Sequence, residues 1–191
     1  MTAPIDPWTR VRTVSDLPAD EVISALQKEV RRGNVENAAA LAFEMLSTSP
    51  ELERKLWDRL LIISAEDVGL GDAMAPVVVE ALERISHRWE RAEGDRTLVA
   101  IHAVRYLATR TKERASDELT NWTRAGFADG SLRPEIPDYA IDMHTARGHA
   151  QGRGLRHFYE EGAKVLPEVE DRDRTWQERV RARLDAEDAA G

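Results

Sequence analysis

The sequence predicts an all-α protein, a helical bundle that is followed by a helical extension. Three observations support this fold class. Apolar residues recur at helical spacing as far as Gly130, no segment shows the period-two alternation of a strand, and the connections between the predicted helices are short. With 42% hydrophobic and 32% charged residues, the composition suits helices that bury one face and expose the other.

Helix start and stop signals predict the order of the elements in the first 130 residues. The first helix is expected from about Pro18 to Arg32, because Gly33 is a strong stop signal. Asn34 is expected to cap the second helix, and Ser49 to cap the third, which has proline in its first turn. The third helix is expected to continue as far as Gly69. Three more helices are predicted: a fourth capped by Asp72, a fifth over about 95–112 and a sixth from near Ser116. Three tryptophans fall in apolar stripes and are expected in the core: Trp57, Trp89 and Trp122.

Composition divides the chain into three regions. Residues 1–17 are polar and contain Pro4 and Pro7, so we expect a flexible N-terminal arm. Residues 18–130 form the predicted helical core domain. Residues 131–191 begin with a proline-containing linker and are expected to form a C-terminal helical extension packed on the core. A helix predicted near Asp138 should be interrupted by glycines, and a last helix is expected over about 171–186.

Composition also excludes several classes of function. The chain has no cysteine, which rules out disulfides, iron–sulfur clusters and thiolate zinc sites. Its formal net charge of −8 argues against a general nucleic-acid binder, although a local basic surface is still compatible with it. We see no signal peptide and no apolar run long enough to span a bilayer, so we expect a cytoplasmic protein without membrane partners.

Two segments carry a resemblance to a known family. They are Ala25–Asn34, which reads ALQKEVRRGN, and Ile63–Asp72, which reads ISAEDVGLGD. Together they resemble the C-terminal region of the replication-associated recombination AAA+ ATPases called RarA or MgsA, over roughly residues 20–112. The resemblance implies a helical domain similar to a clamp-loader collar, which holds subunits together, typically as tetramers. It also implies an AAA+ ATPase or another replication protein as a partner.

The chain lacks the G-x-x-x-x-G-K-[ST] loop that ATP hydrolysis requires, so we expect neither ATPase activity nor a bound cofactor. No Cys nucleophile or G-x-S-x-G elbow is present, and we assign no catalytic residue. The sequence therefore favours a non-enzymatic oligomerisation or adaptor domain associated with DNA replication or repair. The expected partner is a second copy of the chain, in a dimer or tetramer.

A first candidate site is the helix end within the second segment. Glu66 and Asp67 lie in a last helical turn, where acids oppose the helix dipole and need compensation. With Gly69, and with Lys28 and Arg31 of the first segment, they are candidates for an interface or a structural elbow. The two interpretations are an ion pair between subunits and an intrachain salt bridge that shapes the turn.

A second candidate site is the Gly/Arg/His-rich segment 144–157, which contains no acid. Its candidate anion or DNA contacts are His144, Arg147, Arg153, Arg156 and His157. Glycines allow a backbone to approach a phosphate closely, so the segment suggests weak DNA binding or, as an alternative function, a small enzyme or phosphate-ligand binder. The competing interpretation is an intramolecular clasp in which the arginines pair with nearby acids. The spacing of Asp142, His144 and His149 fits a metal site poorly, and we predict none.

Overall fold

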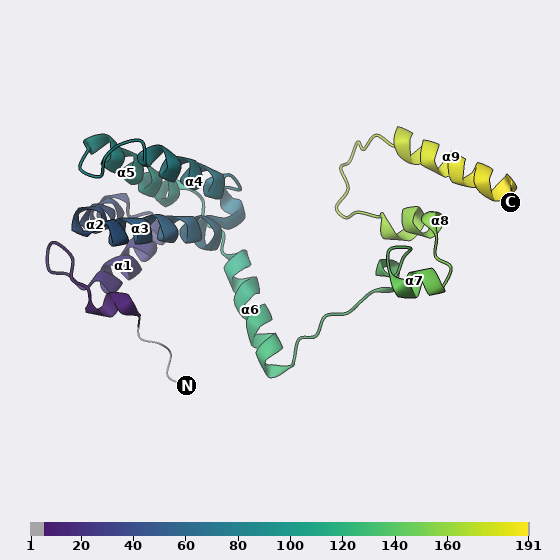
Figure 1. Ribbon diagram of the computed structural model, residues 1–191, viewed down its shortest axis with the longest axis horizontal. Helices are drawn as coiled ribbons and strands as arrows, with labels where there is room; N and C mark the ends of the chain where they lie inside the picture. The colour runs from purple at the N-terminus through teal and green to yellow at the C-terminus, as the bar shows by residue number, and fades with distance from the viewer. Residues whose placement is uncertain (1–5, 191) are drawn as a thin grey trace. The chain divides into compact units, whose positions relative to one another are not determined.

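The computed structural model describes residues 6–190, and all regular structure among them is helical (Figure 1). The predicted all-α class is therefore confirmed for this part of the chain. No helix within it is long and apolar enough to cross a membrane. The chain divides into two compact units, residues 1–132 and residues 133–191, which are described separately below.

The first unit contains the helices that were predicted from start and stop signals. Gly33 ends the first helix with a φ of +77°, and Ser49 caps the third by accepting a 3.2 Å hydrogen bond from the Leu52 amide. The end of α1 and the start of α3 thus follow the predicted signals. Asn34 precedes α2 without a side-chain cap hydrogen bond, and α4 begins at Ala75, three residues after the predicted cap Asp72. The helices are α1 (Ala19–Arg32), α2 (Val35–Thr48), α3 (Pro50–Ile63), α4 (Ala75–Ser86), α5 (Gly94–Thr109) and α6 (Ala115–Asp129).

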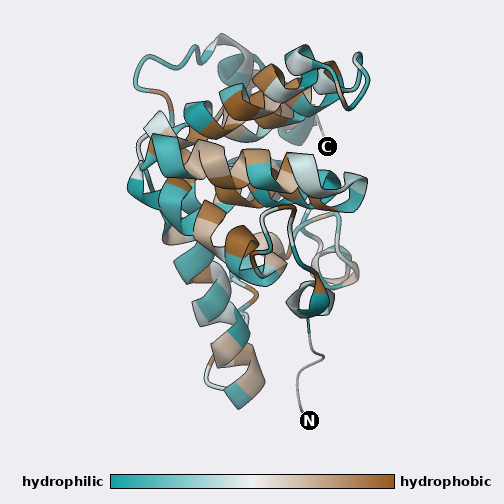
Figure 2. Ribbon diagram, turned by 90° about the vertical axis from the view of Figure 1, so that its left-hand side faces the viewer, coloured by the Kyte–Doolittle hydropathy of each residue, from teal (hydrophilic) through white to brown (hydrophobic). Residues whose placement is uncertain are grey.

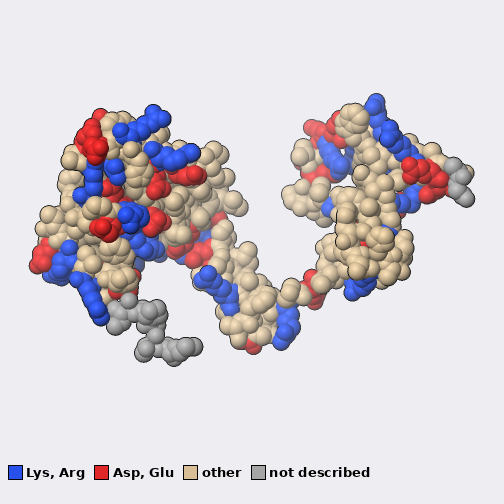
Figure 3. All heavy atoms as spheres, viewed as in Figure 1, with Lys and Arg blue, Asp and Glu red and all other residues tan. Residues whose placement is uncertain are grey.

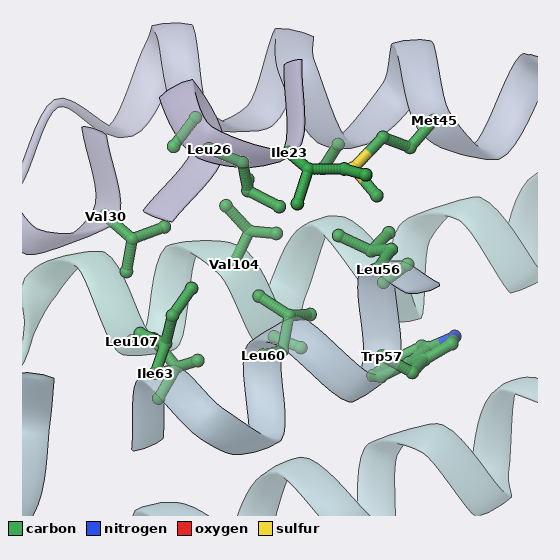
Figure 4. Close-up of a cluster of buried hydrophobic side chains, with 14 of the residues drawn as sticks. Ile23, Leu26, Val30, Met45, Leu56, Trp57, Leu60, Ile63, Val104 and Leu107 are labelled. Carbon is green, nitrogen blue, oxygen red and sulfur yellow. The ribbon is translucent and has the colours of Figure 1, made fainter. Parts of the chain in front are cut away.

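Helices α1 to α5 surround one hydrophobic core, part of which is shown in Figure 4. Leu26 of α1, Leu60 of α3 and Val104 of α5 are fully buried in it. Trp57 of α3 is only 1% exposed, as its place in an apolar stripe predicted. Burial of these aliphatic side chains is the main force that holds the bundle together.

The chain before α1 also contacts this bundle. A 3₁₀ turn covers Pro7–Arg10, and Trp8 and Val11 pack against the core. The Ser15 amide donates a 2.8 Å hydrogen bond to Glu44 of α2. Most of the predicted flexible arm, from residue 6 onward, thus carries specific contacts, while residues 1–5 lie outside the described part.

Helix α6 differs from the other helices of the first unit. It meets the bundle near the π-helical turn Ser64–Val68, and the rest of it extends away from the bundle (Figures 1 and 2). The prediction that Trp122 belongs to the core is wrong, because this side chain is 60% exposed. The apolar stripe is present on α6, but no other helix of the first unit covers Trp122.

The second unit consists of short helical pieces and one longer helix. The helix predicted near Asp138 is only a 3₁₀ turn, Asp138–Ala140. Between Gly148 and Gly154 the helix is interrupted, as the glycines predicted. The remaining elements are α7 (Ala146–Ala150), α8 (Leu155–His157), a π-helical turn (Phe158–Gly162) and α9 (Thr175–Ala190). Leu184 of α9 is buried, whereas Trp176 is largely exposed.

Candidate functional site

The helix end that carries Glu66 and Asp67 is a sharp elbow in the first unit. The π-helical turn Ser64–Val68 widens the end of α3, and Gly69 then reverses the chain with a φ of +51°. A Cβ at Gly69 would lie 2.4 Å from the carbonyl oxygen of Glu113. Glycine is therefore required here twice, once for the backbone conformation and once for the close approach of the segment before α6.

Asp67 is the centre of an ion cluster at this elbow, and its side chain is fully buried. It accepts a 3.0 Å hydrogen bond from Gln27 and a 2.5 Å hydrogen bond from Nε of Arg31. Arg114, which precedes α6, also donates to it. The carboxylate that opposes the dipole of its own helix is thus neutralised by two guanidinium groups of the same chain.

Glu66 widens the cluster by accepting from the same two arginines, at 3.0 Å from Arg31 and 3.3 Å from Arg114. The Glu113 amide donates to the carbonyl of Asp67, so the backbone before α6 is also attached to the elbow. This geometry corresponds to the intrachain interpretation of the site. The structure therefore brings together Arg31, Glu66, Asp67 and Gly69 of the predicted set.

Lys28 does not join this cluster. Its ammonium group instead donates to the hydroxyl of Ser24, at 2.5 Å, on the exposed face of α1. Arg114 completes the cluster and was not among the predicted residues. It lies 47 positions after Asp67, and no local pattern distinguishes it from the other arginines of the chain.

In the second unit, two arginines of the Gly/Arg/His segment pair with acids. Arg153 makes 2.7 Å bonds to both carboxylate oxygens of Asp138 and donates to the carbonyl of Ile141. Arg156 pairs with Glu160, and with Asp185 and Asp188 of α9. These contacts agree with the interpretation of the segment as an intramolecular clasp, in which the arginines pair with nearby acids.

The remaining residues of the segment have different surroundings. His144 contacts Asp142 at 3.1 Å and lies edge-on to the ring of Phe158. Nδ1 of His157 is buried without a hydrogen-bond partner, and Arg147 is exposed without an ion pair among residues 6–190. Arg147 is thus the one arginine of the three that is not already occupied by an acid of the described chain.

Gly148 allows the backbone of the segment to pack closely against the backbone of Asp142. A Cβ at Gly148 would lie 1.9 Å from the carbonyl oxygen of Asp142, so only glycine allows this contact. The backbone and side chain of His144 hold the pKa of the Asp142 carboxyl below its ordinary value. The glycine therefore serves an internal contact, and does not leave the backbone open to an external phosphate. Among the described residues, no three His, Asp or Glu side chains gather as metal ligands would.

A third feature is the uncovered side of α6. Leu119, Trp122 and Phe127 are 61%, 60% and 57% exposed. Their spacing of three and eight residues from Leu119 places them on the same half of the helix. Figure 3 shows mostly uncharged atoms over this helix, whereas basic and acidic side chains alternate over the visible face of the bundle. Sequence periodicity identified the apolar stripe but assigned it to the core.

Comparison with known proteins leaves the family of the chain open. No protein-family model matches the sequence, and no curated protein matches it with significant similarity.

Proposed function

We propose that this chain is a non-enzymatic helical assembly domain that self-associates through the uncovered side of α6. One observation carries the proposal, the exposure of Leu119, Trp122 and Phe127 on a helix that extends from the bundle. A helix of this length that is surrounded by water is only marginally stable, and packing against a second helix supplies the missing burial. Clustered large apolar side chains of this kind mark interaction surfaces.

A second copy of the chain is the occupant that we propose for this surface. A self-complementary contact closes with two-fold symmetry, which gives a dimer or, with a further contact, a tetramer. The proposed setting, DNA replication or repair together with an AAA+ ATPase, rests on the resemblance of residues 25–34 and 63–72 to RarA-type proteins. The same resemblance supports a collar-like role that requires no catalytic residues.

The alternative, a phosphate-ligand site in segment 144–157, has less support. Two of its three arginines are engaged with acids of the second unit, so their charge is largely neutralised there. An anion would have to displace these pairs before it could bind.

Sedimentation velocity of the full chain at micromolar concentration tests the proposal. The wild type should sediment as a dimer or tetramer, and Leu119→Arg should sediment as a 21.5 kDa monomer because a charge is buried at the contact. Leu98→Arg is the matched control, since Leu98 is 64% exposed on α5. A wild type that is entirely monomeric, or equal dissociation by both variants, would refute the contact through α6.

A further inference from the structure

A buried carboxylate in the first unit holds two arginines from the loop between α4 and α5 and from the start of α5. Glu53 of α3 accepts a 2.9 Å bond from Nε of Arg91 and a 2.6 Å bond from Nε of Arg96. Only 4% of its side chain is exposed. Because each arginine approaches through Nε, both terminal nitrogens of each guanidinium are directed elsewhere.

One terminal nitrogen of each arginine is used by a carbonyl group. Nη2 of Arg91 donates to the Leu46 carbonyl, and Nη1 of Arg96 donates to the Trp89 carbonyl at 3.0 Å. The other terminal nitrogen of each has no hydrogen-bond partner among residues 6–190. Arg91 and Arg96 are thus each held by two hydrogen bonds, and each keeps one terminal nitrogen that can donate another.

These two arginines line a cavity of about 310 Å³. Arg54, His87 and Trp57 line it as well. The indole nitrogen of Trp57 is fully buried and has no hydrogen-bond partner, which is costly for a donor. Figure 4 shows this nitrogen at the end of the ring that points away from the labelled core side chains.

We propose that this cavity binds a small oxyanion, the phosphate or carboxylate group of a small molecule. Its walls include the guanidinium groups of Arg54, Arg91 and Arg96. The last two each keep one terminal nitrogen without a hydrogen-bond partner among residues 6–190. All of these are donors, and charged donors hold oxyanions strongly. The volume lies at the lower end of the range for small-molecule sites.

The acids at the cavity are compatible with an anion. Glu53 is already paired with Arg91 and Arg96. Burial raises the pKa of the Glu83 carboxyl, with Asp58 and Glu80 acting in the same direction and His87 opposing them.

The test is a titration of the ¹⁵N-labelled full chain, followed through the indole resonances of its tryptophans. Trp57→Phe assigns the Trp57 resonance by its disappearance. Inorganic phosphate and citrate are added in separate titrations at constant ionic strength, which distinguishes the two kinds of oxyanion. We expect the Trp57 indole resonance to move with saturation in at least one titration.

Two arginine variants decide whether the cavity is the site. Arg54→Gln removes a cavity charge without breaking the pairs of Glu53, and should weaken binding about tenfold. Arg84→Gln removes a similarly exposed charge on α4 outside the cavity, and should leave the affinity unchanged. If the Trp57 resonance moves in neither titration, or if both variants weaken binding equally, the proposal is overturned.

Discussion

At the scale of single residues, Gly69 and Asp67 determine how the elbow after α3 is built. Gly69 has a positive φ and lies against the backbone of Glu113. Asp67 is a fully buried acid that pairs with Arg31 and Arg114. Both residues are therefore sensitive to substitution, for separate reasons, one steric and one electrostatic.

Gly69→Ala should destabilise the first unit by about 3 kcal/mol, because the added Cβ enters backbone atoms and the conformation disfavours side chains. Urea unfolding followed by circular dichroism measures the loss. Gly94→Ala is the control, since a Cβ there meets nothing within 4 Å. It should be neutral or stabilising by about 0.5 kcal/mol. Equal effects of the two substitutions would show that the elbow is not sterically constrained.

Asp67→Asn should cost about 2–3 kcal/mol of unfolding free energy, because it leaves two guanidinium groups with weaker acceptors. Glu66→Gln should cost less than about 1 kcal/mol, since Glu66 is partly exposed and water can replace its contacts. Equilibrium unfolding of both variants checks the order. A larger loss for Glu66→Gln would contradict the central role that burial gives to Asp67.

Sequence reasoning identified Asp67 as an acid in need of compensation, but it did not identify Arg114. The dipole rule acts within one helical turn, so it is visible in a short stretch of sequence. The compensating arginine comes from a different element, and its position depends on how α6 meets the bundle. The same limit applies to Arg91 and Arg96, whose pairing with Glu53 follows from tertiary packing alone.

At the scale of elements, ion pairs connect the short helices and turns of the second unit. The hydrogen bonds from Arg153 hold the pKa of the Asp138 carboxyl below its ordinary value. Folding therefore lowers this pKa, and the folded chain binds fewer protons than the unfolded chain. The contribution of this pair is complete above the ordinary pKa of 3.8 and is lost as the pH falls through the lowered value.

The variant Asp138→Asn tests this pH dependence. Thermal unfolding of wild type and variant should differ most near neutral pH, and the difference should shrink toward zero in strong acid. Asp171→Asn controls for the loss of one negative charge, because Asp171 accepts no side-chain hydrogen bond among the described residues. A difference between wild type and Asp138→Asn that grows on acidification would contradict the stabilising role of the Asp138–Arg153 pair.

The elements that sequence located well are those with strong local signals. The end of α1 follows from Gly33, and the start of α3 follows from Ser49 and Pro50. The short helices and turns of the second unit were harder to predict. Glycines indicate that a helix is interrupted, but they do not indicate which type of turn replaces it. Periodicity could not predict that α6 is exposed. An apolar stripe shows that a helix has an apolar face, but not whether another element packs against that face.

At the scale of the whole molecule, net charge limits contacts with nucleic acid. The chain carries a formal charge of −8, and the visible face of the bundle mixes both signs (Figure 3). Duplex DNA gains affinity from the number of cations placed on its phosphates. With Arg153 and Arg156 already paired to acids, the chain offers few such cations in the segment where they were expected.

The triple variant of Arg147, Arg153 and Arg156 to Ala tests this consequence. Its melting temperature should fall, because two ion-pair clusters are lost, while any weak DNA binding should be unchanged. Arg147→Ala alone should leave the melting temperature unchanged. Titration of fluorescent duplex DNA at several salt concentrations measures the affinity. A decrease of about one unit of log–log salt slope per arginine removed would instead assign these residues to phosphate contact.

The ion cluster at the elbow has a consequence for the architecture of an oligomer. Arg114, just before α6, is anchored to the buried Asp67, so the direction in which α6 leaves the bundle is set inside the protomer. If two copies pair through Trp122 and its neighbours, the angle between the protomers depends on the ion pair between Arg114 and Asp67 within each protomer. Substitution of Arg114 would then alter the shape of the assembly while every contact residue stayed intact.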